Sequence, residues 1–239
     1  MAVSTGYHLT FDVDWAPDWS VQETLEILAE SGASATFFVT HASPTIGMIA
    51  AAGHEIGIHP NFQRASTQGT DPVRIVGNLL ELVPDARVMR THGLIQGSLL
   101  LSEVLRAFPQ ICYDLSLLTY RFAHSGWFNW RLRDAGMQRI NYVWEDDFAF
   151  EDVEHDWAEY RPISSVDVLD FHPIHISLNS RTGEKYERMK DMLGNRPLTS
   201  LAVGEAENLR GTMPGTADYL RAVLASTGKA LSFEELTCV

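Results

Sequence analysis

The chain has 239 residues and 45% hydrophobic side chains, which is enough for one large α/β core or two small ones. Its formal charge is −13, from 18 Lys and Arg against 31 Asp and Glu, and this balance argues against a nucleic-acid backbone or an anionic membrane as the main partner. Two cysteines are too few for a disulfide framework or a thiolate zinc site. The first residues show no signal-peptide pattern and no apolar run reaches about 18 residues, so we expect a cytoplasmic protein without a membrane span.

The first predicted element is a strand over residues 7–15, YHLTFDVDW, in which apolar and polar side chains alternate. An apolar outer face and a polar inner face fit a strand of a barrel that helices cover from outside. The polar face consists of His8, Thr10, Asp12 and Asp14. The next run, SVQETLEILAESG (20–32), predicts a helix whose amino end is capped by Ser20 and Glu23.

Strands and helices then alternate to the end of the chain. Further strands are expected over 34–40, 54–59, 86–90, 112–118, 139–144 and 166–173. Further helices are expected over 43–53, 71–84, 98–108, 130–136, 184–193 and 216–228. This alternation implies parallel pairing, and about seven strands are more than a small open sheet needs. We therefore predict a single α/β domain over residues 1–239, built as a barrel or a doubly wound sheet.

Unusual polar residues gather where these predicted strands end. They are Asp12, Asp14, His59, Arg90, His92 and His172. A single histidine or arginine in such a place is usually a satisfied polar residue or a surface charge. Sites in parallel α/β folds form at the carboxyl ends of strands, so the convergence of these residues at one end indicates a functional site.

The residue types at these strand ends favour metal-assisted hydrolysis. Asp12 and Asp14 are two residues apart and point the same way in a strand, so without a cation their charges repel. One carboxylate can bind a divalent metal while the other acts as a base toward water. His59 is a natural nitrogen ligand, and Arg90 can orient the base carboxylate through a bidentate pair.

Five sequence runs resemble the polysaccharide deacetylases of carbohydrate esterase family 4 in order and spacing. They are TFDVD, GHEIGIHP, MRTHG, VWEDD and DFHP, within residues 7–175. The chain looks especially similar to the cytoplasmic branch that is encoded with surface-polysaccharide biosynthesis enzymes. The resemblance implies a distorted (β/α) barrel with about seven parallel strands. It also implies a metal-dependent hydrolase that removes an N-acyl group, N-acetyl foremost, from an amino sugar or its nucleotide- or lipid-linked form.

The resemblance also implies a role for each matching residue. Asp12 would be the catalytic base, Asp14 and His59 metal ligands, Arg90 the residue that holds Asp12, His172 the general acid, and Asp147 the carboxylate that supports the catalytic network. Zinc is the expected metal for such ligands.

The chain departs from the family pattern at one ligand position. The family supplies a second histidine four residues after the first, and here that residue is Gln63, a poor ligand for a transition metal. The alternatives for the third ligand are Asn61, His92, His175 or water. His92 is the first candidate because it follows Arg90 by two residues and can share a face with it.

Two other functions stay open on the sequence alone. One is hydrolysis of a different C–N bond, in a formamido sugar or a cyclic amide. The other is a metal-free carbohydrate-binding protein that kept the barrel, for which Gln63 is the main support. The acidic segment 145–160 is predicted to be a solvated loop, with a binding element beside the barrel mouth as the alternative.

Overall fold

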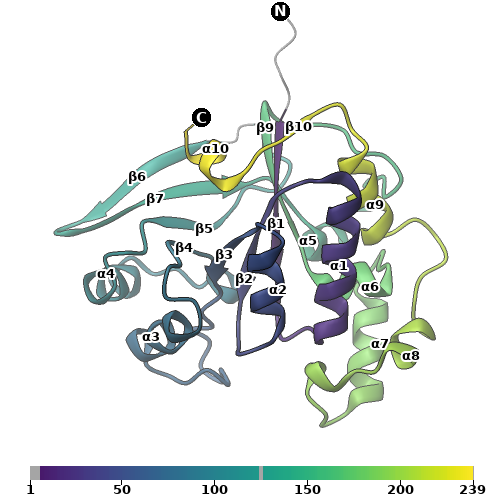
Figure 1. Ribbon diagram of the computed structural model, residues 1–239, viewed down its shortest axis with the longest axis horizontal. Helices are drawn as coiled ribbons and strands as arrows, with labels where there is room; N and C mark the ends of the chain where they lie inside the picture. The colour runs from purple at the N-terminus through teal and green to yellow at the C-terminus, as the bar shows by residue number, and fades with distance from the viewer. Residues whose placement is uncertain (1–5, 124–125, 239) are drawn as a thin grey trace, which may run out of the picture.

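The computed structural model of the chain describes residues 6–123 and 126–238, and its centre is a curled, mostly parallel sheet (Figure 1). Strands β1 (Gly6–Asp12), β2 (Ala35–Val39), β3 (Glu55–Ile58), β4 (Val88–Met89) and β5 (Tyr113–Leu118) lie side by side in chain order. Strand β9 (Val166–Phe171) lies on the other side of β1, and every pair in this series is parallel.

One stretch of chain joins the two sides of the curled sheet. Strand β7 (Ala135–Tyr142) pairs in parallel with β5, and β8 (Trp144–Glu145) pairs in parallel with β9. Between them, the backbone N–H of Val143 donates to the carbonyl oxygen of Val168 at 2.9 Å. If β7 and β8 are counted as one broken strand, they complete a ring with β1, β2, β3, β4, β5 and β9. The predicted distorted (β/α) barrel with about seven parallel strands is therefore confirmed.

Two further strands extend the barrel. Strand β10 (Lys229–Ala230) pairs with β1, and β6 (Trp127–Leu132) forms an antiparallel hairpin with β7. The helix predicted over residues 130–136 is therefore wrong. Arg133 adopts a φ of 58° in the tight turn between the strands, and the aromatic side chains of β6 favour a strand over a helix.

Helices cover the outside of the barrel. The longer ones are α1 (Asp18–Ser31), α3 (Pro72–Leu82), α4 (Ser98–Ala107), α7 (Glu184–Leu193) and α9 (Thr216–Leu224). The shorter ones are α2 (Thr45–Ala51), α5 (Asp146–Ala149), α6 (Pro173–Leu178), α8 (Val203–Glu207) and α10 (Phe233–Thr237), with single 3₁₀ turns at His92–Leu94 and Leu198–Ser200. Within the described ranges, no helix combines the length and the apolar character that crossing a lipid bilayer requires.

The first residues of α3 and α1 can be compared with the predicted helix starts. Asp71, the first residue of the helix predicted over 71–84, caps α3, and its side chain accepts hydrogen bonds from the backbone N–H groups of Val73 and Arg74. The capping box predicted at Ser20 and Glu23 is wrong because α1 already begins at Asp18. Ser20 lies inside the helix, where its hydroxyl is 2.9 Å from that of Ser177.

The alternation in β1 separates two apolar layers. Tyr7, Leu9 and Phe11 belong to the large cluster between the barrel and its helices. A second cluster fills the barrel interior with Phe38, Val88, Leu115, Ile140, Tyr142 and Val168, and α10 closes the end of the barrel where β1 starts (Figure 1). Among the described residues, α10 thus covers one end of the barrel interior, and the cavity described below opens at the other end, where the strands finish.

Gly57 in β3 occupies a position without room for a side chain. A Cβ atom there would lie 2.7 Å from the ring of Phe38 and 2.8 Å from the carbonyl oxygen of Val88. We expect Gly57→Ala to lower the free energy of unfolding by about 1–3 kcal/mol, because the ring and a neighbouring strand would have to move. Urea denaturation measures this change.

Gly47→Ala is the matched control for that variant. A Cβ at Gly47, inside α2, meets no atom within 4 Å, and alanine is the better helix former by about 1 kcal/mol. The control should therefore be as stable as the parent or more stable. Equal losses in the two variants would contradict the steric explanation.

Candidate active site

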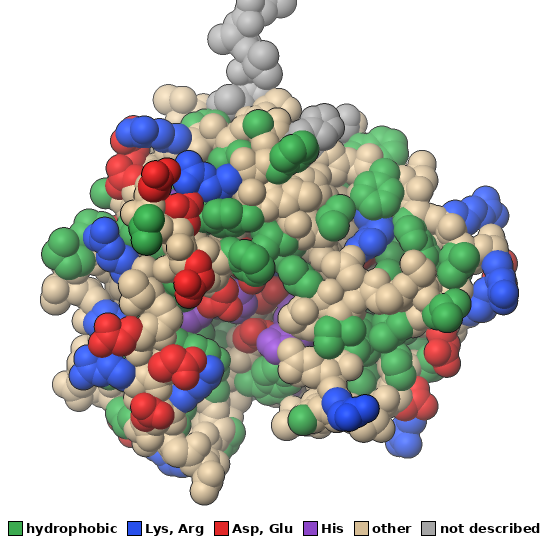
Figure 2. Space-filling model, turned by 180° about the vertical axis from the view of Figure 1, so that it is seen from behind, with side chains coloured by type: hydrophobic (Ala, Val, Ile, Leu, Met, Phe, Trp, Pro, Cys, Tyr) green, Lys and Arg blue, Asp and Glu red, His purple; other side chains and the backbone are tan. Residues whose placement is uncertain are grey.

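A cavity of about 360 Å³ opens at the carboxyl ends of the strands. Figure 2 shows histidine and acidic side chains at the bottom of this hollow. The lining residues are Asp12, Asp14, His59, Thr91, His92, Gly93, Leu94, Glu145, Asp147, Phe148 and His172. Six of the seven residues selected from the sequence are in this set, and the seventh, Arg90, is buried below it.

Arg90 directly follows β4 and is completely buried. Its Nη1 donates to Asp12 Oδ1 at 3.1 Å and also contacts Asp170 Oδ1 on β9. Its Nη2 donates to Thr10 Oγ1 at 2.9 Å, and its Nε donates to the carbonyl oxygen of Leu115 at 2.9 Å. The guanidinium therefore fixes the carboxylate of Asp12 at the end of β1.

Aromatic rings and carboxylates keep this guanidinium charged. The ring centroids of Phe38 on β2 and Tyr142 on β7 lie 4.6 and 4.3 Å from its central carbon. Burial lowers the pKa of Arg90, but the charges of Asp12 and Asp170 outweigh burial and raise its pKa above the usual value.

Asp14, His59 and His92 form a three-membered group of donor atoms. Asp14 Oδ1 lies 3.1 Å from His59 Nε2 and 2.9 Å from His92 Nδ1, and the two ring nitrogens are 3.2 Å apart. Ligands at about 2.0–2.2 Å from a shared divalent ion are separated by roughly 3.0–3.5 Å. The three side chains therefore fit a zinc-like cation, and we call them the Asp14–His59–His92 triad.

The local backbone explains how Asp14 reaches this triad. Strand β1 ends at Asp12, and Asp14 has a φ of 43° in the turn that follows. Burial raises the pKa of Asp14, but its hydrogen bonds with His59 and His92 outweigh burial and hold the pKa well below the ordinary value. The second ring nitrogen of His59 is buried with no hydrogen-bond partner in the part of the chain that the structure describes.

The other candidates for the third ligand make different contacts. The side-chain nitrogen of Gln63 packs against Gly93, where a Cβ would lie 2.7 Å from it. Asn61 Oδ1 accepts a hydrogen bond from the backbone N–H of Gln63 at 2.9 Å. His175 is paired with Asp147, so His92 is the alternative that lies in the triad.

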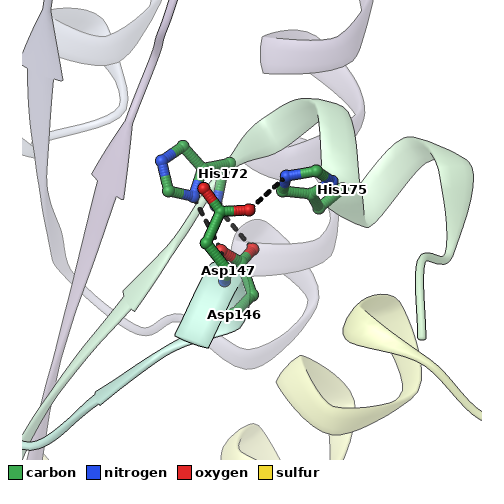
Figure 3. Close-up of side chains that lie close together, drawn as sticks. All are labelled: Asp146, Asp147, His172 and His175. Carbon is green, nitrogen blue, oxygen red and sulfur yellow. Dashed lines mark hydrogen bonds and ion pairs between the residues drawn. The ribbon is translucent and has the colours of Figure 1, made fainter. Parts of the chain in front are cut away.

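His172 lies beside the triad, at the end of the neighbouring strand β9. Its Nε2 lies 3.6 Å from Asp14 Oδ2, while its Nδ1 lies 2.7 Å from Asp146 Oδ1 (Figure 3). The backbone N–H of His172 donates to Asp146 Oδ2 at 2.8 Å. Burial lowers the pKa of His172, but the charges of Asp146 and Asp147 outweigh burial and raise the pKa well above the ordinary value.

The carboxylate that contacts His172 is Asp146, which the sequence analysis did not select. It named the next residue, Asp147, for a supporting role, and Asp147 instead lines the cavity with Oδ1 2.9 Å from His175 Nε2 (Figure 3). The sequence analysis also missed Asp170. The available signals were the run of acidic residues after Trp144 and the position of Asp170 on the same strand face as His172.

The acidic segment predicted as a solvated loop contributes directly to the site. It begins with the last residue of β8 and contains α5, and these place Asp146 behind His172 and Phe148 on the cavity wall. The prediction of a solvated loop is therefore wrong for its first residues, which lie at the barrel mouth.

The chain resembles known proteins both in sequence and in fold. The family model described as WbmS-like polysaccharide deacetylase matches residues 9–190. A crystal structure from Bordetella bronchiseptica, described as a polysaccharide deacetylase involved in O-antigen biosynthesis, is 30% identical with a TM-score of 0.73, and the match covers 92% of this chain and 89% of that one.

More distant structures also match. The Bc1960 peptidoglycan N-acetylglucosamine deacetylase is 13% identical with a TM-score of 0.46, covering 97% of this chain and 87% of that chain. BA3943 from Bacillus anthracis, described as a family 4 pseudoenzyme, is 14% identical with a TM-score of 0.44, covering 80% and 59%. No protein with a curated description matches the chain significantly.

We expect zinc affinity to depend on His92 and not on Gln63. His92→Ala should weaken zinc binding by more than about tenfold, because loss of a residue that only supports a ligand already costs that much. Titration calorimetry with zinc measures the affinity, and Gln63→Ala is the control that should bind like the parent. Unchanged zinc affinity of His92→Ala with a raised Michaelis constant would instead assign His92 to substrate binding.

Proposed function

Because this chain belongs to the family of WbmS-like polysaccharide deacetylases, we propose that it is a metal-dependent hydrolase that removes an N-acyl group, N-acetyl foremost, from an amino sugar. One observation carries the proposal: a carboxylate held by Arg90 and a histidine held by Asp146 face the Asp14–His59–His92 triad in one cavity. Residues 1–239 would act as one catalytic domain.

The relative from Bordetella bronchiseptica suggests the setting of the reaction. It is described as acting in O-antigen biosynthesis. By analogy, the substrate of this chain would be a nucleotide- or lipid-linked amino sugar, a precursor of a surface polysaccharide that is modified in the cytoplasm.

The triad would hold the divalent metal, zinc by default for one carboxylate and two imidazoles. When bound there, the ion would polarise the amide carbonyl and lower the pKa of a nearby water. Three converging donors also weigh against the alternative of a metal-free binding protein.

Asp12 is placed to act as the general base. Its carboxylate lies beside the triad, with Oδ2 3.5 Å from His59 Nε2, and Arg90 holds the other oxygen. It can therefore accept a proton from the attacking water without turning away from the substrate. As the carbon–oxygen bond forms at the amide carbonyl, the carbonyl carbon becomes tetrahedral and the amide nitrogen becomes basic.

His172 is placed to act as the general acid on that nitrogen. Asp146 accepts from Nδ1, so Nε2 points toward Asp14 and into the cavity. The carboxylates of Asp146 and Asp147 favour the protonated imidazole. Transfer of the Nε2 proton to the leaving nitrogen breaks the carbon–nitrogen bond and releases the amine. The same steps would remove a formyl group or open a cyclic amide, so acyl choice depends on the size of the substrate cavity.

Acetate release from N-acetyl amino-sugar nucleotides, measured with and without a chelator, tests the proposed function.

Asp12→Asn should retain zinc and lose about 10²–10⁴-fold in turnover, because the amide keeps the shape of the carboxylate but cannot accept the proton. Elemental analysis of the same preparation measures the metal. Near-parent turnover in this variant would assign the base to another residue.

Asp146→Asn should impair the proposed acid, His172, without affecting metal binding. The change removes the charge that favours protonated His172 and leaves the triad untouched, so zinc affinity should stay at the parent value. Turnover should fall by roughly 10²–10⁴-fold, the range for loss of a general acid. A variant with parent turnover would show that His172 needs no carboxylate partner for its role.

A further inference from the structure

The wall of the cavity opposite the triad comes from a short segment at β8 and α5. Glu145, Asp147 and Phe148 all line the cavity, while Asp146 between them turns toward His172. The ring of Phe148 is 50% exposed, so it offers an apolar surface at the rim. The wall therefore presents two carboxyl groups and one aromatic ring next to the proposed acid.

Asp147 is held in a fixed position from behind. His175 is 2% exposed, and its Nε2 lies 2.9 Å from Asp147 Oδ1 (Figure 3). The imidazole of His175 is itself packed edge-on against the rings of Phe150 and Tyr186, at 4.9 and 5.0 Å between centroids. These contacts hold the Asp147 carboxylate in one orientation at the cavity wall.

The second oxygen of Asp147 is available to a ligand. The side chain is 51% exposed, and no hydrogen bond to Oδ2 is present among the residues that the structure describes. Burial raises the pKa of Asp147, but His172 and His175 outweigh it and hold the pKa below the ordinary value, so the carboxylate is ionised. An ionised carboxylate only accepts hydrogen bonds, so its ligand must be a donor.

The charges around the cavity select the same kind of ligand. Its described lining contains four carboxyl groups, at Asp12, Asp14, Glu145 and Asp147, and neither lysine nor arginine. A phosphate or a sugar carboxylate next to Asp147 would meet like charge, and the described lining offers no lysine or arginine to bind it. Hydroxyl groups of a neutral sugar ring match the carboxylate, and the apolar face of the ring matches Phe148.

We propose that Asp147, positioned by His175, binds the ring hydroxyl on the carbon next to the one that carries the acylamino group, with Phe148 against the sugar ring. The proposal rests on the proposed function, because His172 then marks the place of the amide nitrogen. A ring nitrogen of His172 and a carboxylate oxygen of Asp147 lie within 4.8 Å of each other. A group on the neighbouring carbon of the sugar spans that separation. Substrates would therefore carry a free hydroxyl beside the amide, and any phosphate would lie outside the cavity.

The test compares two probes that the enzyme cannot hydrolyse, methyl glucosaminide and its 3-deoxy analogue. Titration calorimetry should show that the parent binds the hydroxyl-bearing probe about tenfold more tightly, as expected for a hydrogen bond to a charged group. In Asp147→Asn the ratio of the two dissociation constants should fall to near one. His175→Phe, which keeps a ring but loses the donor, should lower the ratio too, and His175→Gln should restore part of it.

Glu151→Gln is the matched control because it removes one exposed carboxylate from the same segment, outside the cavity lining. It should keep the parent ratio. Three results would each overturn the inference. The parent enzyme could bind both probes equally tightly, or it could bind neither probe. Asp147→Asn could also keep the parent's ratio of the two dissociation constants.

Acetate release from methyl N-acetylglucosaminide separates this inference from the proposed function. If acetate is released but the parent binds the two probes equally tightly, the hydroxyl contact is wrong and the proposed hydrolase activity stands. The expected ratio without release, from this compound or from the amino-sugar nucleotides, counts against the hydrolase and leaves Asp147 as a sugar-binding residue.

Discussion

The buried guanidinium of Arg90 is the constraint on which the active end of the barrel depends. A charge taken out of water must be paired, and removing one partner of such a pair typically costs about 3–5 kcal/mol. Here the partners come from three other strands: Thr10 and Asp12 on β1, Asp170 on β9 and the Leu115 carbonyl on β5. The cation can be satisfied only when these strands are in register. The same contacts that stabilise the barrel interior therefore fix the carboxylate that we assign as base.

The segment that closes the barrel contacts residues that support both this base and the proposed acid. The bridging segment from β7 to β8 brings Tyr142 onto Arg90 and, a few residues later, Asp146 onto His172. The base ends β1 and the triad residues follow β1, β3 and β4, whereas the acid follows β9 and receives its carboxylate from α5. The base and the acid thus follow neighbouring strands of the ring, and both line the cavity.

Much of this arrangement could be predicted because it follows from the two-residue alternation of side chains in a strand and from the position of residues at strand ends. Alternation in β1 placed Asp12 on the inner face, and parallel strands ending at one edge brought His59, Arg90 and His172 together. Choices at the scale of one residue could not be predicted. Whether Asp146 or Asp147 meets His172 depends on where α5 begins, and the hairpin at β6 depends on a turn at Arg133 that a helical pattern concealed. Asp170 was missed because its partner, Arg90, is distant in sequence and close only in the folded barrel.

The two imidazoles of the triad come from neighbouring strand ends. The backbone N–H of His92 donates to the Pro60 carbonyl oxygen at 3.0 Å, so the segment after β4 continues beside the segment after β3. This pairing carries the His92 ring to His59, with the two ring centroids 5.2 Å apart. Gln63 packs instead against Gly93, whose φ of 60° and missing side chain leave room for the amide. The segments after β3 and β4 thus each bring one imidazole to the triad, and Gln63 lies outside it. The triad then requires the β3–β4 pairing as well as its three side chains.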